Sequence, residues 1–469
     1  MSDSTSPNHR QIALFATTFD PPGRYHRAAA EALIEHGVTE VVVWPTGHQP
    51  GRGESEHAAS HHRAALADLA FQDLARVWID LTDLENGTYL PPAERERRYA
   101  GSGEVWHAIS ADLVKRDRDG RPALFARWEG GEQLWQAARF LVLHQAGMPP
   151  NTADLPPRHR LIPVDAPHRP SAELRTRIFT NESVDEFLDP KVSTYLSRNR
   201  LYIPGAADRT ARLLVNKPKL MVVYDERNPR ACEVAKKYLP MTGDPPDLIA
   251  VIGGDGTMLH AIRKHWRLRV PFLGINTGHL GFLMNERLPD ELDGLDLVTR
   301  SQPMLQVDAE LPDGQVTRGL AYGDAWLERA EGQAAWIQLD VDGQTQVPKV
   351  VGDGLLVATA AGSSAYARAM GAVPVPLNTR VLTLVGSNVF HPRFWKPMAL
   401  NESVVIRLTN LDRLGKRPLR GYIDGLSLGI VQSMTLRRSA VASVELAFTR
   451  EFDPSAKLLR SLFPPTEDQ

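Results

Sequence analysis

The stretch LIAVIGGDGTMLHAIRK, residues 248–264, decides the fold of the second half of the chain. Leu248–Val251 is an apolar, β-branched run that predicts a buried strand, and Met258–Lys264 predicts a helix. Between them lies the glycine-rich run Gly253-Gly254-Asp255-Gly256-Thr257. Glycines let the backbone approach a phosphate closely, and the helix N-terminus supplies unpaired N–H donors. The order strand, glycine loop, helix therefore indicates a phosphate-handling loop.

Asp255 does not suit a loop that only binds anions, because its carboxylate repels phosphate. It becomes useful if it binds a metal or accepts a proton from an attacking hydroxyl. The alternative is a tight turn in which Asp255 caps the helix. The pentapeptide alone does not separate these two interpretations.

Further motifs surround this loop. Gly274–Leu283 follows a second predicted strand, Pro271–Leu273, and Gly362-Ser363-Ser364-Ala365-Tyr366 and Tyr422-Ile423-Asp424-Gly425 come later. Together these runs resemble the NAD kinase family over nearly all of residues 206–469. The Gly-Gly-Asp-Gly-Thr run is shared with diacylglycerol and sphingoid kinases, whereas Gly274–Leu283 and Ser363–Tyr366 favour the NAD kinases.

The resemblance implies in-line phosphoryl transfer from ATP to NAD, with Mg²⁺ neutralising the polyphosphate. Asp255 would be the general base for the 2′-hydroxyl of the adenosine ribose. The phosphates would be lined by Gly253, Gly254, Gly256 and Thr257. Asn276 and Thr277 would lie at the mouth of the site, where His279 or Phe282 only pack. The segment that holds NAD would include Thr359, Ser363, Ala365 and Tyr366, with the Tyr366 ring as a platform.

This chain departs from the family where the acceptor binds. Gly323-Asp324 stands where the family usually has Asn-Glu contacting the ribose and adenine, so Asp324 keeps a carboxylate on a shorter stem. Thr359-Ala360-Ala361-Gly362-Ser363-Ser364 replaces the family's Thr-Pro-Thr-Gly-Ser-Thr. We expect these changes to alter the acceptor geometry more than the phosphate chemistry.

The first half predicts strands alternating with helices, and therefore a parallel sheet with crossover helices. After the strand Gln11–Phe15 comes Ala16-Thr17-Thr18-Phe19-Asp20-Pro21-Pro22-Gly23-Arg24-Tyr25-His26. This segment resembles the nicotinate/nicotinamide mononucleotide adenylyltransferases, whose signature is Phe-Asp-Pro followed by His-x-Gly-His. Only the second histidine remains, as His26, because Gly23 stands in place of the first.

The adenylyltransferase resemblance extends over most of residues 11–203. It implies that Asp112 contacts the adenosine ribose and that Ser171 and Arg175 bind phosphate, with Arg24 supplying a cation beside the missing histidine. The remaining nucleotide-binding positions would be Thr17, Thr18 and Phe19. The alternative is a domain that binds nucleotides or assembles the protein without catalysis.

Composition excludes several other classes. The formal net charge of −2 gives no bulk field for nucleic acid, and no apolar run is long enough to cross a membrane. The single cysteine, Cys232, forms no internal disulfide or cysteine-based zinc site, and residues 1–10 lack a signal-peptide core, which fits the cytoplasm. His57, His61 and His62 have helical spacing, but a solvated helix start explains them better than a metal site.

The two resemblances combine into one hypothesis. Residues 1–205 form an α/β, Rossmann-like adenylyltransferase domain that makes a dinucleotide from ATP and nicotinamide or nicotinate mononucleotide. Residues 206–469 form an NAD kinase domain with an α/β subdomain and a β-rich subdomain, and the resemblance implies a homo-oligomer. The alternatives are an NAD kinase with an inactive regulatory domain and a nucleotide sensor in which neither site turns over.

Overall fold

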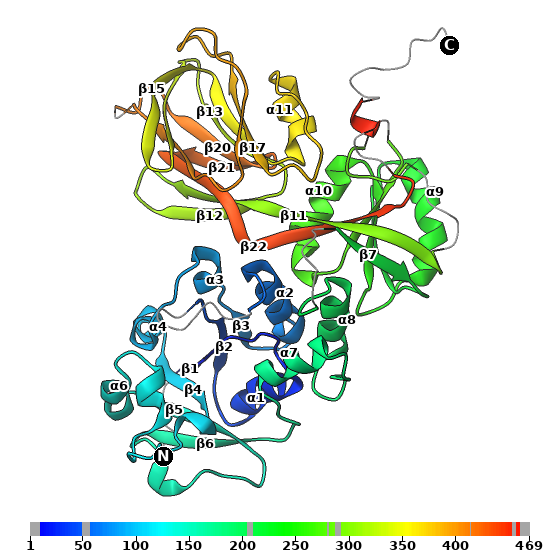
Figure 1. Ribbon diagram of the computed structural model, residues 1–469. Helices are drawn as coiled ribbons and strands as arrows, with labels where there is room; N and C mark the ends of the chain where they lie inside the picture. The colour runs from blue at the N-terminus through cyan, green and yellow to red at the C-terminus, as the bar shows by residue number, and fades with distance from the viewer. Residues whose placement is uncertain are drawn as a thin grey trace, which may run out of the picture. The chain divides into compact units, whose positions relative to one another are not determined.

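A computed structural model describes residues 10–48, 57–203, 210–278, 281–286, 292–412, 414–452 and 456–459. The chain forms two compact units, residues 1–207 and 208–469 (Figure 1). The sequence places this boundary after residue 205. In the described ranges, no helix combines the length and the apolar character needed to cross a membrane.

The first unit is built on a fully parallel sheet whose strands follow the order β3-β2-β1-β4-β5-β6 in its described part. The strands are β1 Gln11–Thr17, β2 Glu40–Pro45, β3 Val77–Ile79, β4 Glu104–Ser110, β5 Phe140–Gln145 and β6 His159–Val164. This is the order of doubly wound dinucleotide-binding sheets, in which ligands bind where the winding reverses. Here the reversal lies between β1 and β4, at the carboxyl ends of the strands.

Helices cover both faces of this sheet, so its strands are apolar on both sides. In β1, Ala13 and Phe15 belong to one buried cluster and Ile12 and Leu14 to another. The first face is covered by α1 Arg24–Glu35, α2 Ser60–Phe71, α7 Ser171–Phe179 and α8 Pro190–Arg198. On the other face lie α4 Pro92–Tyr99, α5 Ala123–Arg127 and α6 Gly131–Ala137, and the short α3 Thr82–Asn86 follows β3.

The terminal helix of this unit is shorter than the sequence predicts. The apolar pattern predicts a helix over Val184–Asn199, whereas α8 begins only at Pro190. Proline disfavours helical geometry at the residue before it but suits the first helical position. Asp189 therefore caps the helix, with its carboxylate accepting a 2.9 Å hydrogen bond from the N–H of Lys191.

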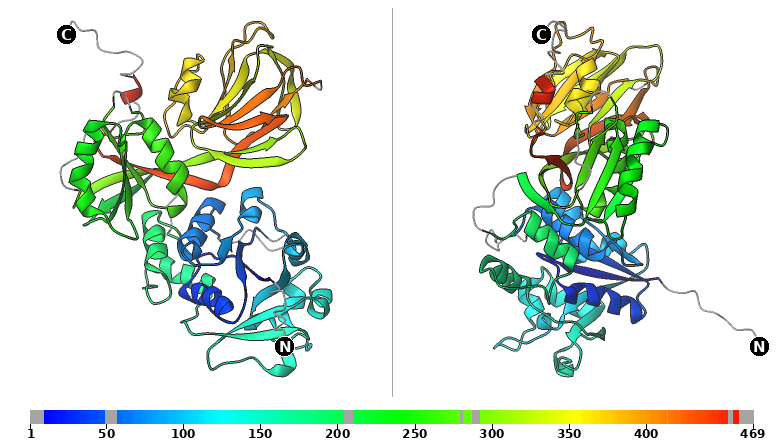
Figure 2. Two further views of the ribbon diagram at one scale, coloured as in Figure 1. Left: turned by 180° about the vertical axis from the view of Figure 1, so that it is seen from behind. Right: turned by 90° about the vertical axis from the view of Figure 1, so that its right-hand side faces the viewer.

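The second unit starts with an α/β subdomain. Its parallel strands are β8 Leu220–Tyr224, β9 Leu248–Gly253 and β10 Phe272–Asn276. The helices α9 Pro229–Tyr238 and α10 Asp255–His265 pack on opposite faces of this sheet (Figure 2). The alternation predicted for residues 219–283 is therefore present, and it places the glycine loop between β9 and α10.

A β-rich subdomain follows. One of its sheets has the order β18-β17-β16-β13-β20-β21, and β14, β15 and β19 pack against it around a shared core. The strands are β12 Val316–Ala321, β13 Asp324–Arg329, β14 Ala335–Val341, β15 Gln344–Gly352, β16 Gly354–Ala358, β17 Val381–Ser387, β18 Met398–Asn401, β19 Ile406–Asn410, β20 Leu419–Ile423 and β21 Leu426–Val431. The short helix α11 Tyr366–Ala369 lies between β16 and β17.

Two long strands run through both subdomains. β22 Ser433–Thr449 pairs with β19 near its start and with β10 near its end, and β11 Leu295–Glu310 pairs along most of it. β11 also pairs with β7 Thr210–Val215. Because β22 belongs to both subdomains, its register aligns the glycine loop with the β-rich sheet.

The Asn285 side chain binds the C-terminal end of β22. Its side chain is 1% exposed, and its amide donates to the carbonyls of Gly274 (2.9 Å) and Ala447 (3.0 Å). Its amide oxygen accepts from the N–H of Thr449 at 2.9 Å. One side chain thus satisfies buried backbone groups on β10 and β22.

We expect Asn285→Leu to destabilise the second unit by about 2–5 kcal/mol, because buried backbone groups lose their partners. Urea unfolding of the full chain measures this effect. Asn401→Leu is the matched control, since Asn401 is exposed. Equal stabilities of the two variants would show that the Asn285 bonds contribute little.

Candidate functional site

The glycine loop of the second unit combines one tightly packed glycine with two that face open space. Gly253 ends β9, and a Cβ there would lie 2.3 Å from Oγ1 of Thr257. A Cβ on Gly254 or Gly256 would meet nothing within 4 Å. Gly253 is therefore required for packing, whereas Gly254 and Gly256 leave free space at the start of α10, as a loop that receives phosphate needs.

Asp255 is the first residue of α10, and its carboxylate turns toward a neighbouring loop. Oδ2 accepts from the N–H of Phe282 at 2.8 Å and Oδ1 from the N–H of Leu283 at 2.9 Å. Burial raises the pKa of this carboxyl, although the two N–H donors and the Lys457 ammonium act in the opposite direction. The bonds fix the carboxylate in one orientation and link the two glycine-rich runs that the sequence singled out.

Asn276 and Thr277 lie at the end of β10, beside the glycine loop. The N–H of Thr277 donates to the Gly253 carbonyl at 2.9 Å, and the Thr277 hydroxyl accepts from Nδ2 of Asn228 at 3.3 Å. The Asn276 side chain accepts from the N–H of Gly278 at 3.0 Å. Both predicted residues are thus near Asp255, and His279 lies outside the described residues.

The segments around Gly323 and Gly362 meet backbone to backbone. A Cβ on Gly362 would lie 2.2 Å from the carbonyl oxygen of Gly323. The hydroxyl of Thr359 donates to the Tyr322 carbonyl at 2.7 Å. Thr359 is 8% exposed, and its hydroxyl proton is therefore used in a hydrogen bond within the protein.

Asp424 binds the opposite side of the same segment. Its carboxylate accepts from the N–H groups of Tyr322 and Gly323 at 2.8 Å and of Asp324 at 3.1 Å. Asp324 is 7% exposed, and burial, together with the nearby Asp424 charge, raises its pKa to about 7. The acceptor-contacting position of the family therefore carries a carboxyl that titrates near neutrality.

An aromatic cluster lies next to Asp324. Tyr366 is 40% exposed and meets the Trp326 ring edge-on at 5.2 Å between centroids, while Trp326 stacks on Tyr422 at 4.7 Å. The sequence singles out Tyr366 but not Trp326. Only the register of β13 against β20, which sets Trp326 opposite Tyr422, reveals that partner.

Two further predicted residues flank the cluster. The buried Ser363 hydroxyl donates to the Ala360 carbonyl at 2.8 Å and accepts from the N–H of Val375 at 3.0 Å. Ala365 leads into α11 just before Tyr366. Ser363 is thus committed to the turn that presents Ala365 and Tyr366, and its contact with NAD stays a prediction.

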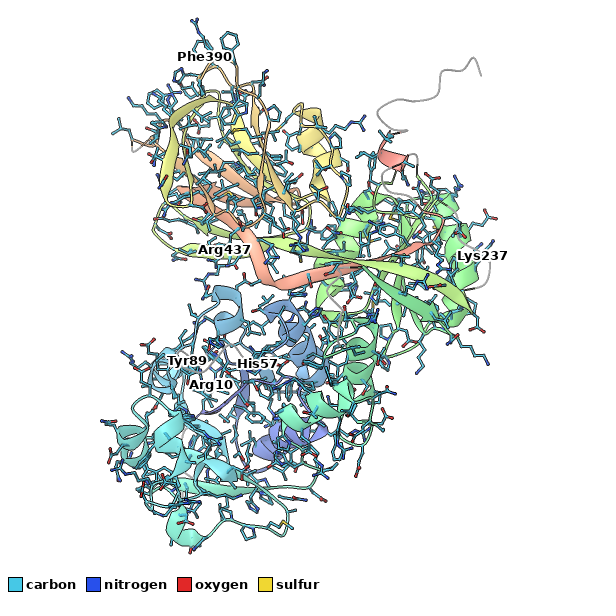
Figure 3. The ribbon with its side chains drawn as sticks, viewed as in Figure 1. Arg10, His57, Tyr89, Lys237, Phe390 and Arg437 are labelled. Atoms are coloured by element: carbon cyan, nitrogen blue, oxygen red, sulfur yellow. The ribbon has the colours of Figure 1, made fainter. Side chains whose placement is uncertain are left out.

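The first unit contains a cavity of about 630 Å³ at the carboxyl ends of β1, β4 and β5, where the winding reverses. His57 and Tyr89, both labelled in Figure 3, line it. Among the predicted nucleotide-binding residues, it brings together Thr17, Thr18, His26, Asp112, Ser171 and Arg175.

His26 enters the cavity from α1 as a neutral imidazole. Its Nδ1 accepts from the N–H of Gly23 at 3.0 Å. Burial and the neighbouring His168 lower its pKa to about 4. At neutral pH the single ring proton therefore resides on Nε2, which can donate to an anionic oxygen.

Two predicted positions lie elsewhere. Phe19 is fully buried, and its ring packs against His26 and Phe71 with centroids 5.4 and 5.2 Å away. The guanidinium of Arg24 donates to the Leu188 carbonyl at 2.8 Å, and Arg24 is not among the residues that line the cavity. The segment before α8 thus engages the Arg24 side chain, and a role for Arg24 in place of the missing histidine stays a prediction.

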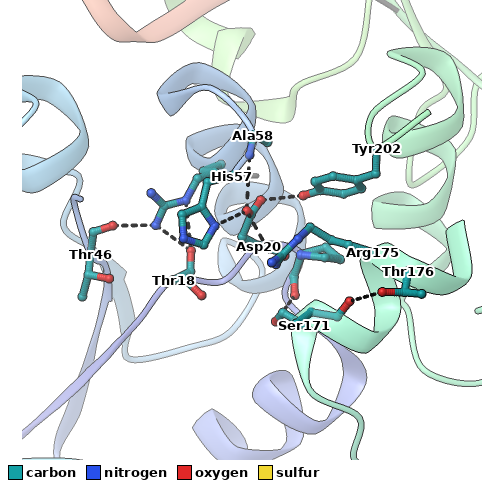
Figure 4. Close-up of polar contacts among 12 residues, drawn as sticks. Thr18, Asp20, Thr46, His57, Ala58, Ser171, Arg175, Thr176 and Tyr202 are labelled. Carbon is teal, nitrogen blue, oxygen red and sulfur yellow. Dashed lines mark hydrogen bonds and ion pairs between the residues drawn. The ribbon is translucent and has the colours of Figure 1, made fainter. Parts of the chain in front are cut away.

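Besides the predicted Arg175, three arginines of the cavity come from positions that the motifs do not mark. Arg95, Arg127 and Arg169 line it together with Arg175. Nη1 of Arg175 donates to the Asp20 carbonyl at 2.7 Å, and the Ser171 hydroxyl donates to the Pro21 carbonyl at 2.9 Å (Figure 4). Both bonds attach α7 to the turn after β1, so the two signature segments form one wall.

Known proteins resemble the second unit. The family model for the ATP-NAD kinase N-terminal domain matches residues 177–294. The NAD kinase of Rickettsia bellii is 33% identical over 255 residues, which are 53% of this chain and 99% of that protein. The chain belongs to the NAD kinase family.

Other members of the NAD kinase family are similarly related. The enzyme of Xanthomonas oryzae is 32% identical over 224 residues, 47% of this chain and 86% of that protein. Yeast NADH kinase complexed with NADH is a solved structure with a TM-score of 0.46 and 16% identity, covering 55% of this chain and 92% of its own. An Archaeoglobus fulgidus NAD kinase in complex with ATP has a TM-score of 0.38 and 22% identity, covering 51% and 98%.

The raised pKa of Asp324 predicts a pH-dependent stability. The folded chain keeps this proton to about pH 7, whereas the unfolded chain loses it near pH 4, so this residue's contribution falls as pH rises between those values. Relative to wild type, Asp324→Asn should become more stable by about 4 kcal/mol between pH 4 and pH 8. Urea unfolding at both pH values measures this. Asp313→Asn, in an exposed turn, should show no such gain, and a constant difference for Asp324→Asn would contradict the shift.

Proposed function

We propose that the second unit transfers the γ-phosphoryl group of ATP to the 2′-hydroxyl of the adenosine ribose of NAD. The observation that carries this proposal is Asp255, a partly buried carboxylate fixed at the start of α10 beside an open glycine loop. The named relatives, which are NAD kinases, support the substrate class.

The chemistry needs a proton acceptor and a phosphate cradle. The oxygen of the 2′-hydroxyl attacks the γ-phosphorus, the bond to the β–γ bridging oxygen breaks, ADP leaves, and Asp255 takes the hydroxyl proton. Its raised pKa makes it a stronger base than an exposed aspartate, which suits this step. The N–H groups at the start of α10 receive the phosphate oxygens.

Mg²⁺ belongs to this proposal as a companion of ATP. Within the described ranges, no three His, Cys, Asp or Glu side chains form a group that could hold a metal ion. Mg²⁺ often binds through substrate phosphates with only one or two carboxylates. We propose that Mg²⁺ binds through the phosphates of ATP, and also that the kinase is a homo-oligomer.

Asp255→Asn should lower kcat for NADP formation by about 10²–10⁴-fold, because an amide cannot accept the proton. Its NH₂ group also faces the N–H of Phe282 or Leu283, so the dissociation constant for NAD and the thermal stability must be measured alongside. Asp247→Asn, before β9 at the far end of the strand, is the control. Full activity of Asp255→Asn would exclude Asp255 as the base.

We further propose that the first unit transfers the adenylyl group of ATP to nicotinamide or nicotinate mononucleotide. The mononucleotide phosphate attacks the α-phosphorus, the α–β bridging bond breaks, and pyrophosphate leaves. Such a reaction depends mainly on positioning and on neutralising charge. The cavity at the switch point, with the Nε2–H donor of His26 and the guanidinium of Arg175, supports this role.

His26→Asn tests this second activity. The Asn amide oxygen can still accept from the N–H of Gly23, but the donor at the Nε2 position is lost. We expect dinucleotide formation from mononucleotide and ATP to fall by about 10²-fold, while NADP formation from NAD stays unchanged. His36→Asn, at the exposed end of α1, is the control. Unchanged dinucleotide formation in His26→Asn would remove His26 from the site.

A domain that binds nucleotide without turnover remains the alternative for the first unit. The loss of the first signature histidine at Gly23 is the observation that favours it. In that case wild-type protein would bind ATP in this cavity but form no dinucleotide from either mononucleotide.

A further inference from the structure

His57 stands in the same cavity as His26, although it belongs to a different segment and to no signature motif. It precedes α2, and its side chain is 27% exposed. Nδ1 of His57 lies 2.7 Å from Oδ2 of Asp20. Because a carboxylate only accepts hydrogen bonds, Nδ1 carries a proton and Nε2 is the ring nitrogen left to meet a ligand.

The carboxylate of Asp20 is itself held in place by several contacts. Its side chain is fully buried, and it also accepts from the hydroxyl of Tyr202 at 2.5 Å and from the N–H of Ala58 at 3.3 Å. Nη1 of Arg175 lies 3.9 Å from Oδ2 of Asp20. Figure 4 shows His57, Tyr202 and Arg175 converging on this carboxylate.

The charges favour an anionic ligand between these groups. Two cavity-lining side chains that can be cationic, His57 and Arg175, share the single buried carboxylate of Asp20. The carboxylate reduces their mutual repulsion and keeps each side chain in one orientation. Carboxylates orient metal-binding histidines in the same way, by accepting a hydrogen bond from the second ring nitrogen. When both ring nitrogens of His57 carry a proton, Nε2 can donate a charge-assisted hydrogen bond to a phosphate oxygen.

A side chain at position 23 would be crowded. A Cβ on Gly23 would lie 3.1 Å from the Phe187 carbonyl oxygen, which already accepts from the N–H of Arg24 at 2.7 Å. Gly23 itself offers no imidazole, whereas His57 is an imidazole in the cavity wall, oriented by Asp20.

We propose that His57, oriented by Asp20, contacts the phosphate chain of a nucleoside triphosphate in this cavity and substitutes for the histidine that Gly23 replaces. This inference rests on the adenylyl transfer proposed for the first unit. Asp20 is then a positioning residue, and His57 touches the substrate.

Two isosteric substitutions separate ligand contact from support of Asp20. The amide of His57→Asn reaches the Nδ1 position and keeps the donor to Asp20, but leaves the Nε2 position empty. His57→Gln places its amide near the Nε2 position and loses the bond to Asp20. We expect kcat/KM for ATP in dinucleotide formation to fall by about 30- to 100-fold in His57→Asn and by less in His57→Gln.

A smaller loss of kcat/KM in His57→Asn than in His57→Gln would overturn the inference. That order is expected if His57 only donates a hydrogen bond to Asp20, because Asn keeps this bond and Gln loses it. Thermal unfolding of both variants shows whether a lost activity reflects a lost fold. NADP formation from NAD by the same preparations should equal that of wild type.

A readout independent of activity uses the full chain and diethyl pyrocarbonate, with the modification of each histidine followed by mass spectrometry. At ten times their dissociation constants, ATP and inorganic tripolyphosphate should slow modification of His57 by about tenfold, whereas adenosine should not. His36, exposed at the end of α1 and outside the cavity, is the internal standard. Protection by adenosine alone, or no protection, would overturn the contact with phosphate.

The two proposals fail differently. Wild-type protein that forms no dinucleotide from either mononucleotide overturns adenylyl transfer, and tripolyphosphate protection then decides the His57 contact by itself. Wild-type protein that forms dinucleotide, with His57 neither protected nor sensitive to the Asn substitution, overturns only the role of His57.

Discussion

A buried carboxylate must receive several hydrogen bonds, because burying an unpaired charge costs several kcal/mol. Three carboxylates that are wholly or partly withdrawn from water organise this protein: Asp20, which is fully buried, and the partly buried Asp255 and Asp424. Each accepts hydrogen bonds from a segment distant in the chain. Asp20 reaches Tyr202 across 182 residues, Asp424 reaches Tyr322 across 102, and Asp255 reaches Leu283 across 28. In each site, the need of the carboxylate for hydrogen bonds brings distant segments together. Each carboxylate thereby fixes a loop at the end of strands.

This constraint explains how the second unit combines regular strands with irregular loops. The parallel strands β8, β9 and β10 position the glycine loop, and Asp255 then attaches the loop after β10 to the start of α10. In the β-rich subdomain, Asp424 holds the Tyr322–Asp324 segment. The close approach of the Gly323 carbonyl oxygen explains the glycine at position 362, because a Cβ there would lie 2.2 Å from that oxygen. A Cβ on Gly323 itself would lie 3.2 Å from Oδ1 of Asp424.

Much of this architecture could be predicted from the sequence, because strand and helix patterns are local. Residues 248–264 alone predict a strand over Leu248–Val251 and a helix from Met258, whereas β9 extends to Gly253 and α10 already begins at Asp255. Contacts made at a distance could not be predicted in this way. Phe19 and Arg24 lie inside a signature motif, yet Phe19 is buried in the core and the Arg24 guanidinium binds the Leu188 carbonyl. Trp326 and His57 lie outside any motif and become visible only through strand register and the Asp20 contact.

The two units have complementary proposed chemistry, since the dinucleotide made in the first is the acceptor for the second. The most direct test follows the products that wild-type protein forms from nicotinamide or nicotinate mononucleotide with excess ATP and Mg²⁺. If one chain carries out both steps, a dinucleotide appears first and is then converted to its 2′-phosphorylated form, with pyrophosphate and then ADP as by-products. Recovery of unchanged mononucleotide, from a preparation that still phosphorylates NAD, would contradict the claim that one chain carries out both steps.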